Sequence, residues 1–160
     1  GVYYAKADGS SITEIAFPML TPNGIGLSPD GNTLYVAETE GARLWAFDII
    51  EPGHLARRLF PSPNGERFLF NQSGYHRFDS LAVDADGNIC VATLMSGGIT
   101  VISPAGELVR SVPMPDVYTT NICFGGPDLR TAYITLSGIG QLVAMPWPIP
   151  GLKLNNAAHS

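Results

Sequence analysis

Two residues with oxygen-bearing side chains, Asn23 and Asp79, stand at the same position of a repeated sequence pattern. Each directly precedes a short apolar segment that ends in an Asp-Gly turn. An amide oxygen and a carboxylate that converge there are hard donors, which suit Ca²⁺, Mg²⁺ or Mn²⁺ better than Zn²⁺. A carboxylate beside a bound cation can also remove a proton from water. The alternative is structural: Asn23 precedes Gly24 in a turn, and Asp79 caps the end of a strand.

Four further polar residues lie near this position and are weaker candidates for substrate binding. Thr120 stands at the third equivalent position, with Asn121 beside it. Tyr75 and His76 lie on the segment that leads into the second repeat. For each of the four, a packing or surface role is the alternative to substrate binding.

Three segments of the chain share the pattern that carries these residues. Each has a short apolar strand, a turn built from Pro, Asp or Gly, and a second apolar strand; they cover residues 23–39, 79–94 and 120–136. A repeat of about 40 residues with material for four strands is typical of the blades of a β-propeller. The pattern therefore predicts sheets whose first strands carry the candidate residues.

The repeats predict an all-β chain made of about three propeller blades. We expect blades at about residues 21–77, 78–115 and 119–150, with residues 1–17 supplying the last two strands of a preceding blade. Propellers close with roughly four to eight blades, so the chain is expected to form half of a ring. The stretch 51–77 is longer than the other repeats need. We expect it to be an inserted loop that forms one wall of the channel mouth.

Charge and composition exclude several classes of protein. The net charge is −5 at pH 7, and the nine Lys and Arg are dispersed, which argues against nucleic acid and anionic membranes as partners. Hydrophobic residues make up 45% of the chain, which excludes intrinsic disorder. The 18 Gly and 13 Pro are scattered, which indicates many turns and not a helical bundle. The chain does not begin with Met, and its localisation is left open.

Three further residues and one segment carry specific expectations. Cys90 and Cys123 lie in apolar stretches, and we expect both to be buried free thiols. Glu38 follows the second strand of its repeat, and we expect it to face solvent at the opposite rim. Residues 84–88 resemble the opening of a calcium-binding loop but lack its later Gly and Glu, so we expect no calcium there.

A family resemblance is carried by three phrases in order and spacing: PNGIGLSPDGNTLYVAET, FDSLAVDADGNICVATLMSGGITVISPAGELVRSVPMP and TTNICFGGPDLRTAYIT. They resemble the C-terminal half of the gluconolactonase, regucalcin (senescence marker protein) and luciferin-regenerating-enzyme-like family. The resemblance covers nearly all of residues 1–145. It implies that residues 1–160 are the C-terminal half of one six-bladed β-propeller with a divalent cation in its central channel. It also implies a lactone hydrolase that is active only together with its N-terminal half.

The resemblance assigns roles to two residues of this sequence. Asn23 matches a metal ligand of the family, and Asp79 matches a residue that is both metal ligand and proposed general base. Phe78 and Ser80 replace the Pro and Gly that are common beside this Asp. A further Glu ligand of the family would precede residue 1. The implied cofactor is one divalent cation, Ca²⁺ first, with Zn²⁺, Mn²⁺ or Mg²⁺ as alternatives. The implied partners are a small lactone substrate and the complementary half of the propeller.

Three functions remain open on the sequence. The first is a cation-dependent hydrolase of sugar lactones, in which the cation polarises the carbonyl and Asp79 deprotonates water. The second is a paraoxonase-like hydrolase of aryl esters or phosphotriesters. The third is a non-catalytic propeller that binds metal or protein. A substrate profile separates the first two functions.

Overall fold

The computed structural model describes residues 1–62 and 64–154 and confirms the expected all-β class. Within this part, fourteen strands occur and no helix. The strands are β1 (Val2–Ala5), β2 (Ile12–Ala16), β3 (Pro22–Leu27), β4 (Thr33–Glu38), β5 (Arg43–Glu51), β6 (His54–Leu55), β7 (Glu66–Asn71), β8 (Arg77–Val83), β9 (Ile89–Leu94), β10 (Gly98–Ile102), β11 (Leu108–Pro113), β12 (Thr119–Gly125), β13 (Thr131–Leu136) and β14 (Gln141–Pro146). The expected domain of residues 1–160 also includes residue 63 and residues 155–160, which lie outside the described residues.

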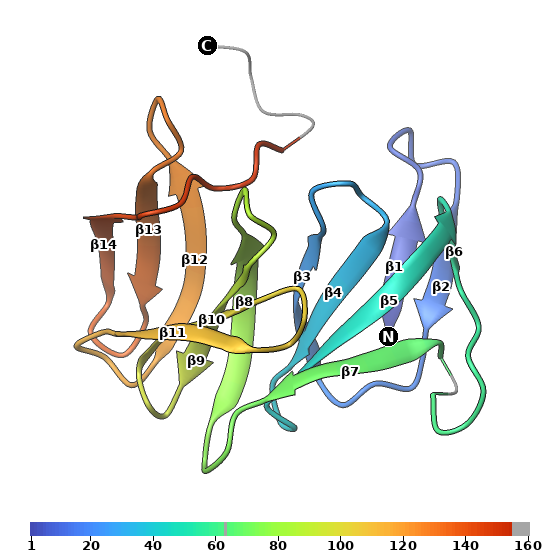
Figure 1. Cartoon of the computed structure of the whole chain (residues 1–160), viewed down its shortest axis with the longest axis horizontal. Helices are drawn as coiled ribbons and strands as arrows, with labels where there is room; N and C mark the ends of the chain where they lie inside the picture. Colours follow the sequence, from blue (N-terminus) through green and yellow to red (C-terminus); the bar gives the residue numbers. More distant parts are fainter. Residues whose placement is uncertain (63, 155–160) are drawn as a thin grey trace.

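The strands form four antiparallel sheets in the order of the sequence. β1 and β2 form the first sheet, and β3, β4, β5 and β7 form the second, with the short β6 also on β5. The third sheet contains β8 to β11, and the fourth contains β12 to β14. The sheets stand side by side like the blades of a propeller (Figure 1).

The first strands of the last three sheets lie next to one another. β8 packs against β3 on one side and against β12 on the other. All three run in the same direction, and their starts gather at the lower end of the molecule in Figure 1. The residues that the sequence repeat aligns therefore lie at one end of the molecule.

Apolar side chains fill the spaces between neighbouring sheets. Phe78 and Val83 point from β8 toward the second sheet, where they meet Leu44 and Leu69. The strands in the middle of a sheet are buried on both faces, as in β9, where the five residues Ile89 to Thr93 are buried. Burying one large apolar side chain stabilises a fold by about 1.5–3 kcal/mol. These contacts fix the angle between the blades.

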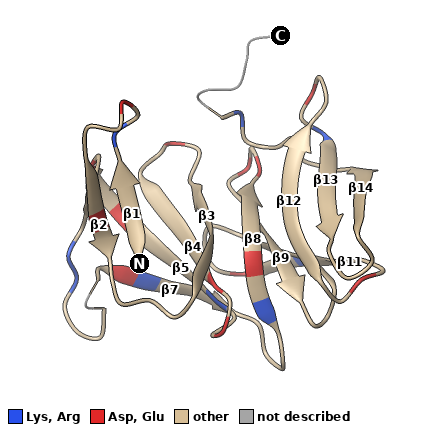
Figure 2. Ribbon diagram, turned by 180° about the vertical axis from the view of Figure 1, so that it is seen from behind, with Lys and Arg blue, Asp and Glu red and all other residues tan. Residues whose placement is uncertain are grey.

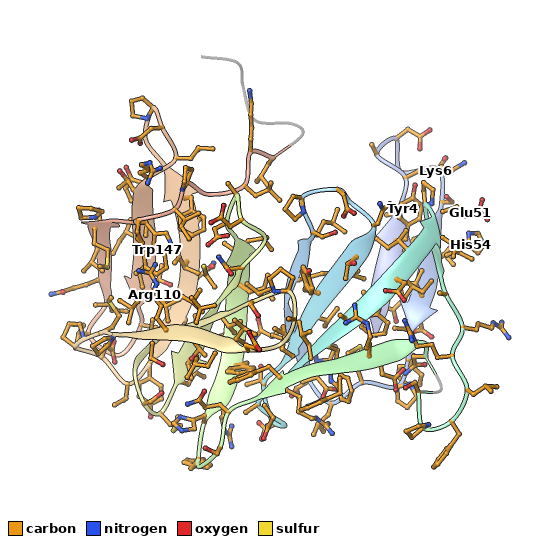
Figure 3. The ribbon with its side chains drawn as sticks, in the orientation of Figure 1. Tyr4, Lys6, Glu51, His54, Arg110 and Trp147 are labelled. Carbon is orange, nitrogen blue, oxygen red and sulfur yellow. The ribbon has the colours of Figure 1, made fainter. Side chains whose placement is uncertain are left out.

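A tryptophan closes the space between the third and fourth sheets. Trp147 follows β14, is buried and packs against Phe124 of β12, with ring centroids 5.8 Å apart. The guanidinium of Arg110, from β11, lies 4.2 Å from the centroid of the same ring (Figure 3). Cation–π contacts of this kind join side chains from two blades and so hold the blades together.

The expectation that residues 51–77 form an inserted loop is wrong for most of this stretch. It contains β6 and also β7, which pairs with β5 and is the fourth strand of its sheet. The connection between β6 and β7 lies beside the first sheet, because the Asn64 amide donates to the Pro18 carbonyl at 3.1 Å. Figure 3 shows Tyr4 of β1 beside Glu51 and His54. Only residues 72–76 lead from the outer strand to the start of β8.

Both cysteines are free, but only Cys90 is buried. Successive residues of a strand point to opposite faces of the sheet. On β12 this alternation turns Ile122 into the core and leaves Cys123 exposed, so the expectation of burial is wrong for Cys123.

In the part of the chain that the structure describes, no helix has the length and apolar character needed to cross a membrane.

Candidate functional site

Each of the three inner strands begins with a β-bulge. In each pair the inner strand advances three residues while its partner advances two, so the register shifts at the same place. The pairs are Pro22–Glu38 and Ile25–Val36, Phe78–Thr93 and Leu81–Val91, and Thr119–Leu136 and Ile122–Ile134. Bulges redirect side chains and are frequent beside active sites. The first residue inside each bulge is Asn23, Asp79 or Thr120, the three positions that the sequence repeat aligns.

The structure brings two of these residues into contact. The Asn23 side chain lies close enough to the Asp79 carboxyl to lower its pKa, and the two residues come from adjacent strands, β3 and β8. A glycine makes this approach possible, because a Cβ atom on Gly24 would lie 2.6 Å from the Asp79 carbonyl oxygen. It would also lie 2.8 Å from the Leu81 backbone nitrogen. Side chains at this position would therefore force the two strands apart.

The environment of Asp79 favours its neutral form. Burial raises the pKa of the half-buried Asp79 carboxyl above its ordinary value. Hydrogen bonds from the Asn23 side chain and the Ser80 backbone oppose this rise in pKa. No Lys, Arg or His among the described residues forms a salt bridge with Asp79. Asp79 is thus a carboxylate with a partner for hydrogen bonding but no cationic partner.

The third bulge is arranged differently. The hydroxyl of Thr120 lies 2.9 Å from that of Thr135, on the neighbouring strand β13. The Asn121 side-chain oxygen accepts the backbone N–H of Ile122 at 2.8 Å. These bonds stay within one sheet, so the structure gives Thr120 and Asn121 local partners and no bond to Asn23 or Asp79.

The segment before β8 carries the other two candidates. Tyr75 is exposed, and the guanidinium of Arg77 lies 5.7 Å from its ring centroid. The Nδ1 atom of His76 is buried and has no hydrogen-bond partner among the described residues. An unpaired imidazole nitrogen close in sequence to Asp79 is a group that a ligand could satisfy.

Glu38 lies beside the site and is buried, so the expectation that it faces solvent at the opposite rim is wrong. Only 3% of its surface is exposed, and it pairs with Pro22, directly before the first bulge. β4 is a central strand, so both of its faces are covered. A signal was present in the sequence, because a hairpin that joins β4 to β5 places Arg43 directly opposite Glu38.

A groove runs along the later residues of the inner strands, and of the candidate residues only Asn121 lines it. It has a volume of about 690 Å³, and its wall is mostly apolar, with Ile25 and Leu27 of β3, Leu81 and Val83 of β8, and Cys123 and Phe124 of β12. Figure 2 shows charged segments on β8 and none on β3 or β12. By sequence, the charged residues of β8 are Arg77 and Asp79.

The donor set fits part of a divalent-cation site. The Asn23 side chain lies beside the Asp79 carboxyl, and its amide oxygen is an acceptor that could serve as a ligand. A carboxylate and an amide oxygen suit a hard cation, but Ca²⁺ takes about six to eight oxygen ligands. The described residues contain no group of three or more His, Cys, Asp and Glu that could hold a metal. The remaining ligands would come from water or from residues beyond those described.

Residues 1–138 match the protein family described as the SMP-30/gluconolactonase/LRE-like region. Lactonase drp35 of Staphylococcus saprophyticus is 33% identical over 115 residues, which are 72% of this chain and 34% of that protein. The 6-deoxy-6-sulfogluconolactonase of Pseudomonas putida is 28% identical over 141 residues, 86% of this chain and 46% of that protein. The pentonolactonase XacC of Haloferax volcanii is 29% identical over 139 residues, 86% of this chain and 45% of that protein.

Solved structures show the same fold. A gluconolactonase from Xanthomonas campestris superposes with a TM-score of 0.71 at 27% identity, over 92% of this chain and 44% of that chain. The calcium-binding protein regucalcin from Agrobacterium tumefaciens superposes with a TM-score of 0.76 at 21% identity, over 95% of this chain and 55% of that chain. The chain thus spans between 34% and 55% of the length of the proteins that it matches.

Proposed function

Because the chain belongs to the SMP-30/gluconolactonase/LRE-like family, we propose that its protein hydrolyses sugar lactones with the help of one divalent cation. Relatives named lactonase, 6-deoxy-6-sulfogluconolactonase, pentonolactonase and gluconolactonase support the reaction class. The observation that carries the proposal for this chain is the proximity of Asn23 and Asp79 at the starts of two adjacent inner strands.

In this proposal Asn23 and Asp79 hold the cation through their side-chain oxygens. When bound, the cation supplies Lewis acidity that polarises the lactone carbonyl. Asp79 takes the proton of the attacking water, and burial aids this task because it raises the pKa of the carboxyl toward neutrality. Asn23 lies beside the carboxylate and helps to orient it. The water oxygen bonds to the carbonyl carbon, the C–O bond of the lactone ring breaks, and the departing ring oxygen takes the proton from Asp79, which gives a hydroxy acid.

Oxygen donors without thiol or imidazole ligands favour Ca²⁺ as the cation, with Mn²⁺, Mg²⁺ and Zn²⁺ as alternatives. His76 is proposed to contact the substrate, because its buried Nδ1 lacks a partner among the described residues. Tyr75, Thr120 and Asn121 are proposed as further, weaker substrate contacts near the starts of the inner strands.

The proposal includes a complementary part of the propeller. The chain covers about half of its relatives' length, and β1 is paired on one edge only, with β2. We propose that the remaining cation ligands and substrate contacts lie in that complementary part, and that hydrolysis requires it.

The test is a substrate profile of the full-length protein, before and after removal of divalent cations. We expect hydrolysis of five- and six-membered sugar lactones, its loss after chelation, and its recovery on addition of Ca²⁺. Faster hydrolysis of aryl esters or phosphotriesters would favour the paraoxonase-like alternative. Cation binding without any hydrolysis would favour a non-catalytic propeller.

A further inference from the structure

We propose that Glu38 is a positioning residue, which fixes the chain before the first bulge and so aims Asn23 at the cation. The inference rests on the proposed function, because it concerns the same site. Glu38 itself would touch neither cation nor substrate.

The Glu38 carboxylate joins three segments of the chain. Its Oε1 atom accepts the backbone N–H of Leu20 at 2.6 Å. Its Oε2 atom accepts the indole N–H of Trp45 at 2.7 Å and lies 2.8 Å from a guanidinium nitrogen of Arg43, with which it forms a salt bridge. Hydrogen bonds to a buried charged group are worth about twice as much as neutral ones. The side chain is therefore held by β5 while it holds the residue that precedes β3.

A second set of bonds fixes the next residue. Thr21 has a φ of 49°, a left-handed conformation that non-glycine residues adopt only when the surroundings hold them there. Its hydroxyl accepts the backbone N–H of Glu40 at 2.9 Å, and its carbonyl accepts that of Thr39 at 3.0 Å. Leu20 and Thr21 are thus tied to the end of β4 and to the turn that follows it. Asn23 lies two residues further on.

The same turn also reaches the strand of Asp79. The Glu40 carboxylate lies 2.8 Å from the guanidinium of Arg77, at the start of β8. Residues 38–40 therefore contact the entry of both strands whose bulges carry the site. The Glu40–Arg77 pair is partly exposed and contributes little by itself. Glu38 is buried, and its bonds are therefore expected to dominate.

Glu38→Gln is the informative substitution, because it keeps the size of the side chain and removes its charge. A glutamine has one acceptor oxygen for three donors, and its NH₂ group must face at least one of them. The substitution also leaves Arg43 without its carboxylate partner. We expect the bond to Leu20 to weaken and residues 20–23 to become more mobile.

Asp84→Asn is the matched control. Asp84 is also a fully buried carboxylate, and it accepts the backbone N–H groups of Asp86 at 3.0 Å and Asn88 at 2.9 Å. It follows β8, at the end away from the bulge. Loss of a buried carboxylate should lower the unfolding temperature of both variants, whereas only Glu38→Gln should change the site.

The experiment is calorimetric titration of Ca²⁺ and Mn²⁺ into the full-length protein, together with amide hydrogen exchange in the absence of cations. We expect Glu38→Gln to weaken cation binding by about 10- to 100-fold, the usual effect of removing a residue that orients a ligand. We also expect faster exchange at Leu20, and Asp84→Asn should change neither measurement at the site.

The outcomes separate this inference from the proposed function. If the parent binds cations and Glu38→Gln binds them equally well, Glu38 does not position Asn23, and the proposed function stands. If the parent neither binds cations nor hydrolyses lactones, the proposed function fails. Amide exchange at Leu20, Thr21 and Asn23 then decides alone: faster exchange in Glu38→Gln supports the positioning of Asn23, and unchanged exchange overturns it.

Discussion

The side chain of Asn23 lies beside the carboxyl of Asp79 across the boundary between two blades and lowers its pKa. Each residue is the first inside a bulge at the start of an inner strand. The site therefore depends on three things: the two bulges, the close approach of their strands, and the residues before each bulge. Each can be tested separately.

Asp79→Asn should reduce lactone hydrolysis by at least ~10²-fold, because the variant lacks both the proposed base and one ligand charge. Initial rates of the purified full-length protein measure this. Asp86→Asn removes an exposed carboxylate from the turn after the same strand and should retain the parent rate. A rate above a tenth of the parent's in Asp79→Asn would show that Asp79 is not the base.

Asn23→Ala should weaken cation binding more than it lowers the unfolding temperature, because the side chain is exposed and contributes little to the core. Titration calorimetry with Ca²⁺, Mn²⁺ and Zn²⁺ measures the affinities. Asn32→Ala, in the turn that follows β3, is the control of the same residue type. Equal affinity of parent and Asn23→Ala for all three cations would remove Asn23 from the site.

Gly24→Ala should destabilise the protein by about 1–3 kcal/mol, the usual cost of overpacking. The added Cβ meets backbone atoms of β8, which cannot move aside without separating the strands. Gly26→Ala is the control on the same strand, because its Cβ first meets a methyl group of Leu81, the end of a flexible side chain. Denaturant unfolding compares the two variants. Equal stability in both would mean that β3 does not need its close approach to β8.

His76→Ala should raise KM or change the preference among lactones, with little change in the unfolding temperature. The buried Nδ1 atom has no partner among the described residues, so its removal breaks no hydrogen bond of the folded state. Steady-state kinetics with several lactones and a thermal melt measure both effects. A substrate profile identical to the parent's, or a large fall in unfolding temperature, would assign His76 to packing.

Residues 1–160 expressed alone should self-associate. Apolar side chains are exposed on β3 and β14, with Ile25 at 52%, Leu27 at 44% and Leu142 at 67%, and one edge of β1 is unpaired. Exposed apolar faces and free strand edges promote association. Light scattering gives the mass, with the full-length protein as control. A monodisperse, active monomer of 17.0 kDa would contradict both the need for a complementary part and the proposed site.

The strands and the pairing of Asn23 with Asp79 could be predicted because both follow from the repeat. Apolar alternation marks the strands, and stacked repeats place equivalent residues at one end of neighbouring sheets. The bulges could not be predicted from the repeat, because a register shift depends on how two strands pair and not on either strand alone.

Two errors have a physical cause in common. The stretch 51–77 is longer than the other repeats need, which predicts an inserted loop, yet β7 within it pairs with β5. The position of Glu38 after the second strand of its repeat predicts an exposed side chain, yet the donors of Leu20, Arg43 and Trp45 compensate its burial. In both cases the contacts that decide the outcome come from residues distant in the sequence.

The bulge that opens each inner strand has a wider consequence. One backbone geometry occurs three times and carries an amide, a carboxylate and a hydroxyl, at Asn23, Asp79 and Thr120. The first residue of each bulge can therefore differ from blade to blade while the pairing of the sheet is kept. The charge presented to a ligand is then set by one residue per blade, so a scaffold of this kind can acquire a new specificity through single substitutions.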